Sequence, residues 1–382
     1  RGKPDDKQVQ PVVPTQTSTV KADAKLLYAM NEQGADGGFF PVGPWGESRL
    51  WHGGVHMAQP EGTKVFAPFP GRLVAARLGS SSPIGSMNFV LLRHAMSLAD
   101  RKLDFYSLYM HLADEKQGTK EPLEWLAKAR SDKNGKPKEL KAGEVWLLDE
   151  PIEAGQVVGL VGTVGPENLA RPQLHVEMFS ISDLFEGMKN TQWTPVDGTS
   201  SGRFCEAPEI IDQIDTNRDK KLSREELRAF FNSNGESMHY FVTRHVSEWT
   251  AEPSWADALK LAKDFRGLKP EVIDQYVADQ ITPGLWWDDR VAQHARLPPD
   301  AVVYHYHPIT FVSFVNQRLA EADEKADKRA IDVKDTKEIP PGITDDRHGE
   351  GMANVDAAVE DTCNAKITMK ELLQGFAAPE CK

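Results

Sequence analysis

Residues 62–74, Gly-Thr-Lys-Val-Phe-Ala-Pro-Phe-Pro-Gly-Arg-Leu-Val, carry the pattern of a strand, a turn and a second strand. Apolar side chains alternate with others on both sides of a Pro-Gly pair, as they do in strands that are joined by a turn. Further strands are expected at four later segments, residues 88–94, 105–112, 151–159 and 174–179. The first half of the chain is therefore predicted to be mostly β.

Three histidines accompany this pattern. His52 and His56 are four residues apart in Trp-His-Gly-Gly-Val-His, residues 51–56, and histidines so spaced on an extended segment can face one metal ion. His175, from the last predicted strand, can close the site. Neutral imidazole nitrogens suit Zn²⁺, and three protein ligands leave a fourth position for water. The alternative interpretation is two loop histidines and an unrelated core histidine.

The order of these segments resembles the M23 (lysostaphin-like, LytM) peptidoglycan endopeptidases over roughly residues 38–180. The resemblance rests on the glycine turns of residues 151–165, on Tyr-Met-His-Leu at 109–112 and on Gln-Leu-His-Val-Glu at 173–177. It implies a mostly antiparallel β domain that acts on peptidoglycan and holds zinc at the positions of His52, His56 and His175.

Two residues of this site depart from the family pattern. The second metal ligand of the family is an aspartate, where this chain has His56, and the catalytic histidines fall at His111 and Gln173. Glutamine can hydrogen-bond a water molecule but does not exchange a proton near neutral pH, so acid–base catalysis is predicted to be impaired. A degenerate, wall-binding or regulatory module is the alternative to an active peptidase.

Composition bounds the remaining functions. With 382 residues, two or three domains are expected, and a formal net charge of −12 argues against a nucleic-acid partner. No apolar run reaches membrane-spanning length. Residues 1–24 are expected to be a linker, and the absence of an initiator methionine and a signal peptide suggests a piece of a longer protein.

Three cysteines, Cys205, Cys363 and Cys381, allow either one disulfide or three thiols.

The second half changes its hydrophobic period beyond the polar Gly/Ser cluster at 197–202. Helical spacing is found in six segments, residues 208–214, 223–231, 238–249, 255–265, 270–278 and 309–322. Residues 323–356 are charged and are expected to form an exposed excursion. The chain is thus predicted to be an α+β multidomain protein, with a β domain at 25–197 and a helical domain at 203–382.

A calcium loop is predicted at residues 215–226. Oxygen ligands occur at loop positions one, three, five and twelve, and the seventh position offers a backbone carbonyl; these residues are Asp215, Asn217, Asp219, Glu226 and Lys221. The loop resembles an EF-hand, whose oxygen ligands suit Ca²⁺. Lys220 replaces the glycine of position six, and a capped, charged helix N-terminus is the alternative. Residues 360–371 resemble only a remnant of a second loop.

The predicted helix at 238–249 ends in Glu248 beside a tryptophan. It resembles the general-acid element of lysozyme-like enzymes, in which a partly apolar cleft raises the pKa of a glutamate. Asp257 follows nine residues later, as in phage-type lysozymes, although Lys263 replaces their threonine. A solvated helix end is the alternative. Residues 204–320 also resemble type VI secretion effectors that attack peptidoglycan.

These features predict a secreted, antibacterial peptidoglycan hydrolase that acts in the periplasm of a target bacterium. In its lysozyme-like domain, Glu248 would protonate the glycosidic oxygen, and Asp257 would position water or stabilise the oxocarbenium-like state. The cofactors would be calcium and zinc, and the partners an immunity protein and a secretion carrier. The alternatives are a zinc-dependent endopeptidase or amidase in the N-terminal domain, and a non-catalytic wall-binding or secretion cargo module.

Overall fold

The computed structural model describes residues 27–28, 31 and 39–42 and most of residues 51–335. Within the longer stretch it leaves out residues 99–100, 115–122, 132–133, 137, 166–169, 189–191, 199–211, 220–221, 234 and 251–266. The predicted linker, the second calcium-loop remnant, all three cysteines and the predicted helix at 255–265 lie outside the described residues.

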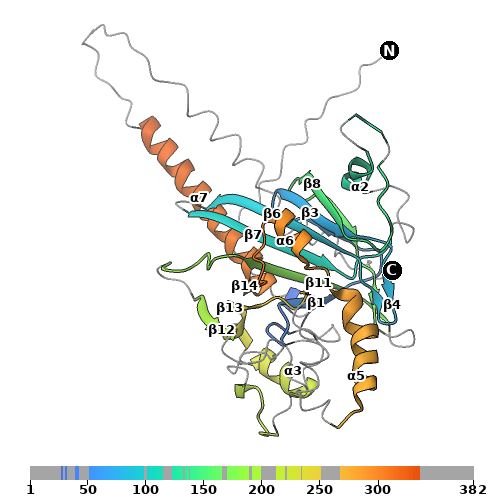
Figure 1. Cartoon of the computed structure of the whole chain (residues 1–382). Coiled ribbons are helices and arrows are strands. Elements are labelled where there is room, and N and C mark those ends of the chain that lie inside the picture. The colour runs from blue at the N-terminus through green and yellow to red at the C-terminus, as the bar shows by residue number, and fades with distance from the viewer. Residues whose placement is uncertain are drawn as a thin grey trace, which may run out of the picture.

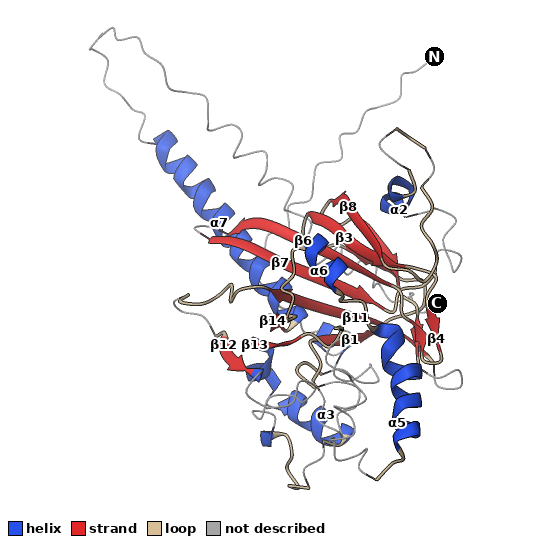
Figure 2. Ribbon diagram, in the orientation of Figure 1, coloured by secondary structure: helices blue, strands red, loops and turns tan. Residues whose placement is uncertain are grey.

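One large sheet dominates the described part of the chain (Figures 1 and 2). Its main path runs β12-β13-β14-β11-β7-β6-β3-β8, and β1 pairs with β11 beside this path. Every pair along the path is antiparallel except β12–β13. The strands of the path and β1 are β1 (Gly54–Ala58), β3 (Gly71–Arg77), β6 (Phe89–Leu98), β7 (Arg101–Met110), β8 (Trp146–Ile152), β11 (Arg171–Ser180), β12 (Thr194–Asp197), β13 (Phe241–Val246) and β14 (Val302–Tyr306).

Shorter strands and helices complete the described structure. β4 (Ser81–Ser82), β5 (Gly85–Ser86) and β10 (Thr163–Val164) extend from β11, while β2 (Lys64–Phe66) and β9 (Val157–Leu160) form a separate pair. The α-helices are α2 (Glu124–Ala129), α3 (Arg224–Ser233), α5 (Pro270–Tyr276), α6 (Asp289–Ala295) and α7 (Pro308–Asp335). Three other helical segments are η5 (Gly235–Tyr240), η7 (Val277–Ile281) and η8 (Thr282–Gly284). None of the described helices is long and apolar enough to cross a membrane.

Alternation along the strands separates two buried cores. On β11, Leu174, Val176 and Met178 join the larger core, which includes the first turns of α7. Phe179 faces the opposite way, into a second core with α6 and the Trp286–Trp287 pair. Because neighbouring side chains on a strand point to opposite faces, His175 and Glu177 lie on the same face as Phe179. The α6 face of the sheet therefore carries the polar site.

The β predictions for the first half are confirmed. The expected segments at 62–74, 88–94, 105–112, 151–159 and 174–179 all contain strands of the structure. The helical predictions at 223–231, 270–278 and 309–322 correspond to α3, α5 and α7. Helix α7, however, continues to Asp335, so the first part of the excursion expected from residue 323 is helical instead.

The predicted helix at 238–249 is wrong. Residues Gly235–Tyr240 form a 3₁₀ helix, and Phe241–Val246 form β13, which pairs with β12 and β14. Strands from both sides of the expected boundary at 197–203 thus share one sheet. The described C-terminal half mixes strands with helices, and a separate, mostly helical lysozyme-like domain is not confirmed.

Candidate metal centre

The three predicted ligands come together on the β1–β11 pair. His56 in β1 and His175 in β11 are directly opposite each other in the antiparallel register, and His52 lies just before β1. All three side chains are buried, and one possible ligand atom from each lies within 4.8 Å of the others. The structure therefore confirms the grouping of His52, His56 and His175 that their sequence positions predicted.

Two glycines allow this close approach. A Cβ atom on Gly54 would collide with the Val176 carbonyl oxygen and lie 2.7 Å from Cε1 of His175. On Gly53 it would lie 2.6 Å from Glu177 Oε1. The Gly-Gly pair is therefore required for the backbone between His52 and His56 to pass directly beside the β11 side chains.

A carboxylate from the C-terminal half holds His52. The Nδ1 atom of His52 lies 3.0 Å from Oε1 of Glu248, and the backbone N–H of Gly53 donates a hydrogen bond of 2.8 Å to the same oxygen. An N–H at Nδ1 facing this carboxylate leaves Nε2 of His52 with its lone pair. That Nε2 atom is buried and has no hydrogen-bond partner among the described residues.

A second buried carboxylate stands beside His175. Glu177 lies two residues further along β11; its Oε2 is 3.7 Å from His175 Nε2, and its Oε1 is 2.8 Å from His305 Nδ1. The indole N–H of Trp249 donates a hydrogen bond of 2.6 Å to Oε2. Burial alone would raise the pKa of Glu177, but the contacts with His175 and His305 outweigh it and hold the pKa below its usual range. Glu177 is therefore ionised.

His111 completes the cluster from the end of β7. It has a positive φ of 62°, and its Nδ1–H donates to the Ser86 carbonyl oxygen at 2.8 Å. The other nitrogen, Nε2, therefore carries a lone pair, and it lies 3.3 Å from Nε2 of His56. Burial, together with the nearby His175 and His52, lowers the pKa of His111 to about 3. His111 is therefore a neutral imidazole at neutral pH, and its Nε2 contacts His56.

Gln173 lies on the same face of β11 as His175, two residues before it, and is buried. Its register partner in β1 is Ala58. The amide can orient a water molecule or a substrate group, but it supplies no proton. Any proton transfer at this end of the site would fall to His111.

The donor set fits zinc. Nδ1 of His175, like Nε2 of His52, is buried and has no hydrogen-bond partner in the described structure. Buried polar atoms are normally satisfied, so unsatisfied imidazole nitrogens in histidines whose possible ligand atoms lie within 4.8 Å of one another indicate a missing partner. Burial lowers the pKa of His175, which keeps it in the neutral form that binds metal. Three imidazole ligands match a zinc site with one open position.

The predicted calcium loop is described in part. Glu226 accepts hydrogen bonds from the backbone N–H groups of Thr216 at 3.1 Å and Ser223 at 3.0 Å. Ser223 Oγ in turn accepts from the Glu226 N–H at 3.2 Å, so the pair caps α3. Hydrogen bonds to the Glu226 carboxylate, first from the Ser223 backbone and then from the Ser223 and Thr216 hydroxyls, lower the pKa of Glu226 to about 2. Asp215 and Asn217 both accept from the Asp219 N–H, while Lys221 lies outside the described residues.

The predicted general acid occupies a different place from the one expected. Glu248 is buried in a turn after β13 and contacts His52, so it is not at the end of a helix facing an open glycan cleft. Asp257 lies outside the described residues. The structure thus joins Glu248 to the histidine site.

Three residues of this site were assigned no role from the sequence, namely Glu177, Trp249 and His305. Glu177 could have been identified, because a residue two positions after His175 must share its face of the strand. His305 lies in Tyr-His-Tyr-His, residues 304–307, whose strict alternation is a strand signal. Nothing local to Trp249 predicts its contact with Glu177.

No protein family and no curated protein matches the chain. Among solved structures, it is similar to the catalytic domain of the antimicrobial peptidase lysostaphin from Staphylococcus simulans, with 20% identity over 35% of this chain and 71% of that chain and a TM-score of 0.18. It is also similar to a mutant catalytic domain of the prophage-encoded M23 protein EnpA from Enterococcus faecalis, with 23% identity over 34% and 67% and a TM-score of 0.16. Both likenesses cover about a third of the chain, so the chemistry of the site is inferred from its own residues.

Proposed function

We propose that this protein is a zinc-dependent hydrolase that cleaves a peptide or amide bond of peptidoglycan, as an endopeptidase or amidase. The observation that carries the proposal is the buried cluster of His52, His56 and His175, with the neutral imidazole of His111 beside it. The resemblance of residues 38–180 to M23 enzymes supplies the substrate class.

Each residue of the site has a role in this proposal. His52, His56 and His175 would hold the metal, and a bound zinc ion supplies a Lewis acid that activates water and polarises a carbonyl group. His111 would accept the proton of the attacking water through Nε2, in place of its contact with His56, because its Nδ1–H donates to the Ser86 carbonyl oxygen. Gln173 orients water or substrate through its amide.

Metal analysis tests the site. Protein that has never been exposed to a nickel column is expected to contain about one zinc ion per chain, and His56→Ala is expected to lose it. His294→Ala serves as the matched control, because His294 lies on α6 and bonds to the Leu148 carbonyl oxygen outside the cluster. Wild-type protein that stays free of zinc after equilibration with excess metal would contradict the proposal.

Product analysis tests the reaction. Purified peptidoglycan is digested with the protein, and mass spectrometry identifies the new chain ends. Free peptide amines support the metal-dependent reaction, whereas new sugar ends support the second candidate, glycan cleavage by Glu248 and Asp257. We place glycan cleavage second because the Glu248 carboxylate is engaged by His52 and Gly53. No products would favour a non-catalytic cargo or wall-binding role.

Delivery and regulation remain proposals from the effector resemblance. They comprise secretion to the periplasm of a target bacterium, an immunity protein that blocks the enzyme, and a carrier of the secretion system. Calcium binding at residues 215–226 is likewise a proposal, and it rests on the oxygen-rich spacing of the loop.

A further inference from the structure

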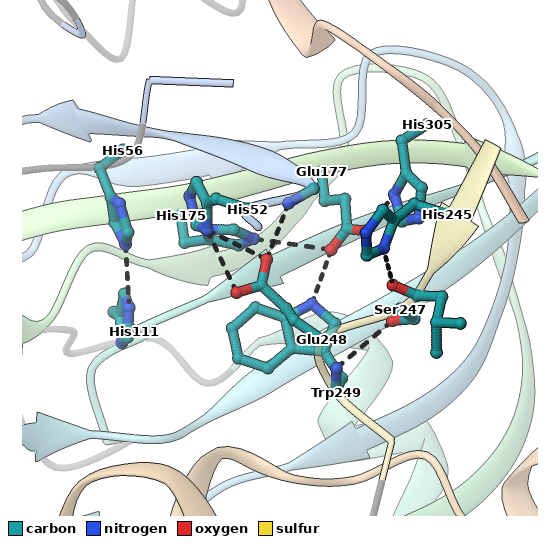
Figure 3. A network of polar contacts seen from close by, with 12 residues as sticks. His52, His56, His111, His175, Glu177, His245, Ser247, Glu248, Trp249 and His305 are labelled. Atoms are coloured by element: carbon teal, nitrogen blue, oxygen red, sulfur yellow. Dashed lines mark hydrogen bonds and ion pairs between the residues drawn. The ribbon is translucent and has the colours of Figure 1, made fainter. Parts of the chain in front are cut away.

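The turn that follows β13 lies directly against the histidine site (Figure 3). Two consecutive residues of this turn, Glu248 and Trp249, each bind a different part of it. Glu248 contacts Nδ1 of His52, and the Trp249 N–H donates to Glu177 beside His175. The Trp249 ring also packs edge-on against the His175 ring, with centroids 5.2 Å apart and an interplanar angle of 80°. One short segment thus contacts both ends of the cluster.

The Glu248 contact has two chemical effects on His52. It fixes the tautomer that leaves Nε2 without a proton, and it makes the imidazole more electron-rich, so that Nε2 is a stronger ligand. Both side chains of the pair are buried, with exposed fractions of 1% for His52 and 7% for Glu248, so water screens their interaction little. The Gly53 N–H holds the same carboxylate in place.

We propose that Glu248 is a positioning residue for the metal ligand His52, and that the C-terminal half therefore completes a metal site whose ligands all come from the N-terminal half. Trp249 supports the same site through Glu177. The inference rests on the proposed zinc site, but it concerns residues beyond the M23-like segment, which ends near residue 180. It replaces the general-acid role that the sequence suggested for Glu248.

Zinc affinity of the full chain distinguishes these roles. Dissociation constants are measured by competition with a chromogenic chelator for the wild type, Glu248→Gln and Trp249→Phe. Glutamine can still accept a hydrogen bond from His52 but lacks the negative charge, so Glu248→Gln is expected to bind zinc about 10- to 100-fold more weakly. Trp249→Phe keeps a ring and removes the N–H, and a smaller loss of up to about 10-fold is expected. Glu271→Gln, at an exposed glutamate of α5, is the matched control and should bind as the wild type does.

A spectroscopic measurement separates positioning from general loss of structure. With Co²⁺ in place of zinc, Glu248→Gln should shift the visible absorption bands, because the ligand field of His52 changes, while melting of the metal-free proteins should change little. If Glu248→Gln is too unstable for this comparison, Trp249→Phe provides the second test, with the same direction expected for affinity and spectrum.

Three outcomes overturn the inference in distinguishable ways. Zinc binding by the wild type, with the same affinity and cobalt spectrum in Glu248→Gln and Trp249→Phe, would leave the metal site standing and remove the positioning role. Unchanged zinc affinity with loss of glycan cleavage in Glu248→Gln would return this residue to general-acid chemistry. A wild-type protein without affinity for zinc would contradict the proposed function and the inference together.

Discussion

His111 has a positive φ of 62°, a conformation that few non-glycine residues adopt, although histidine adopts it more often than most. This conformation turns the ring back from the end of β7, so that one nitrogen meets the Ser86 carbonyl and the other approaches His56. The local geometry thus fixes both the direction and the tautomer of the ring.

Replacing His111 should separate catalysis from metal binding. His111→Gln is expected to lower the rate of peptide cleavage by about 10²–10⁴-fold, because the proton acceptor is lost, while zinc content stays near that of the wild type. Initial rates on purified peptidoglycan and elemental analysis of the same preparation measure the two effects. Wild-type turnover by His111→Gln would show that it is not the base.

His94 should make stability depend on pH. Burial lowers its pKa to about 4, and its Nδ1–H donates to the Pro70 carbonyl oxygen while Nε2 accepts from the Ser107 hydroxyl. Between pH 6.5 and 4 the unfolded chain binds a proton here that the folded chain does not, so stability falls as the pH falls. This group contributes a slope of about 1.4 kcal/mol per pH unit.

Urea unfolding between pH 7 and pH 4.5 measures this effect. In His94→Gln the free energy of unfolding should fall less steeply with decreasing pH than in the wild type. The difference between the two slopes should correspond to one proton, whatever the free energy of unfolding of the variant at pH 7. His294→Gln, at an exposed histidine of α6, is the control for the loss of a histidine as such and should change the slope less than His94→Gln does. Equal slopes in wild type and His94→Gln would mean that His94 does not remain neutral.

The grouping of the three histidines was predictable because two of them share one extended segment and the third lies in a recognisable strand. Their partners were harder to predict. Glu248 is 196 residues from His52 in the chain, and only the fold brings the two together. Helical spacing around Glu248 suggested an independent site, and no local pattern reveals a contact over such a separation.

Among the elements, β13 shows how tertiary structure outweighs a local pattern. Its residues, Phe-Val-Thr-Arg-His-Val, have an apolar stripe at helical spacing but also three β-branched side chains. Because β13 lies between β12 and β14, its backbone N–H and C=O groups pair with a strand on each side. The antiparallel strands of the first half were predictable because their alternation and glycine turns agree with the pairing.

The β1–β11 pair should be sensitive to one methyl group. Gly54→Ala places a Cβ against the Val176 carbonyl and the His175 ring, so the strands must separate. A loss of about 1–3 kcal/mol in stability and a clear fall in zinc affinity are expected. Thermal unfolding and chelator competition measure them.

Gly62→Ala is the control for this substitution. A Cβ at Gly62 meets nothing within 4 Å, although the positive φ of 79° adds backbone strain. Stability should therefore fall modestly and zinc affinity should not change. Wild-type affinity in Gly54→Ala would mean that the site tolerates a wider separation of the two strands.

The loop before α3 is expected to respond to calcium. If Asp215, Asn217, Asp219 and Glu226 bind Ca²⁺ in the folded state only, calcium raises the melting temperature by mass action. The double change Asp215→Ala and Glu226→Ala should abolish this response, whereas Glu225→Ala, at an exposed neighbour, should retain it. Equal calcium-induced shifts in the double variant and the wild type would place the ion elsewhere.

At the scale of the whole molecule, the sheet joins the two halves of the chain. β14 pairs with β11, and the larger core contains residues from Leu27 to Val315. The change in composition near residues 197–202 suggested a boundary because it marks a change in local pattern, but strand pairing is not visible in composition.

This continuity predicts one cooperative unfolding transition for the described structure. Circular dichroism and the release of bound zinc should report the same midpoint on heating, and a chain that ends at residue 198 should bind zinc more weakly than the full chain. Two well-separated transitions, with tight zinc binding by the shorter chain, would instead support independent domains.

The long separation between His52 and Glu248 also sets an order of events during synthesis. At about 5–20 residues per second, Glu248 is translated about 10–40 s after His52. A growing chain thus passes through a stage in which all three clustered histidines exist and the carboxylate that contacts His52 does not. Zinc captured in that interval would exchange readily, and only the finished chain would retain it firmly.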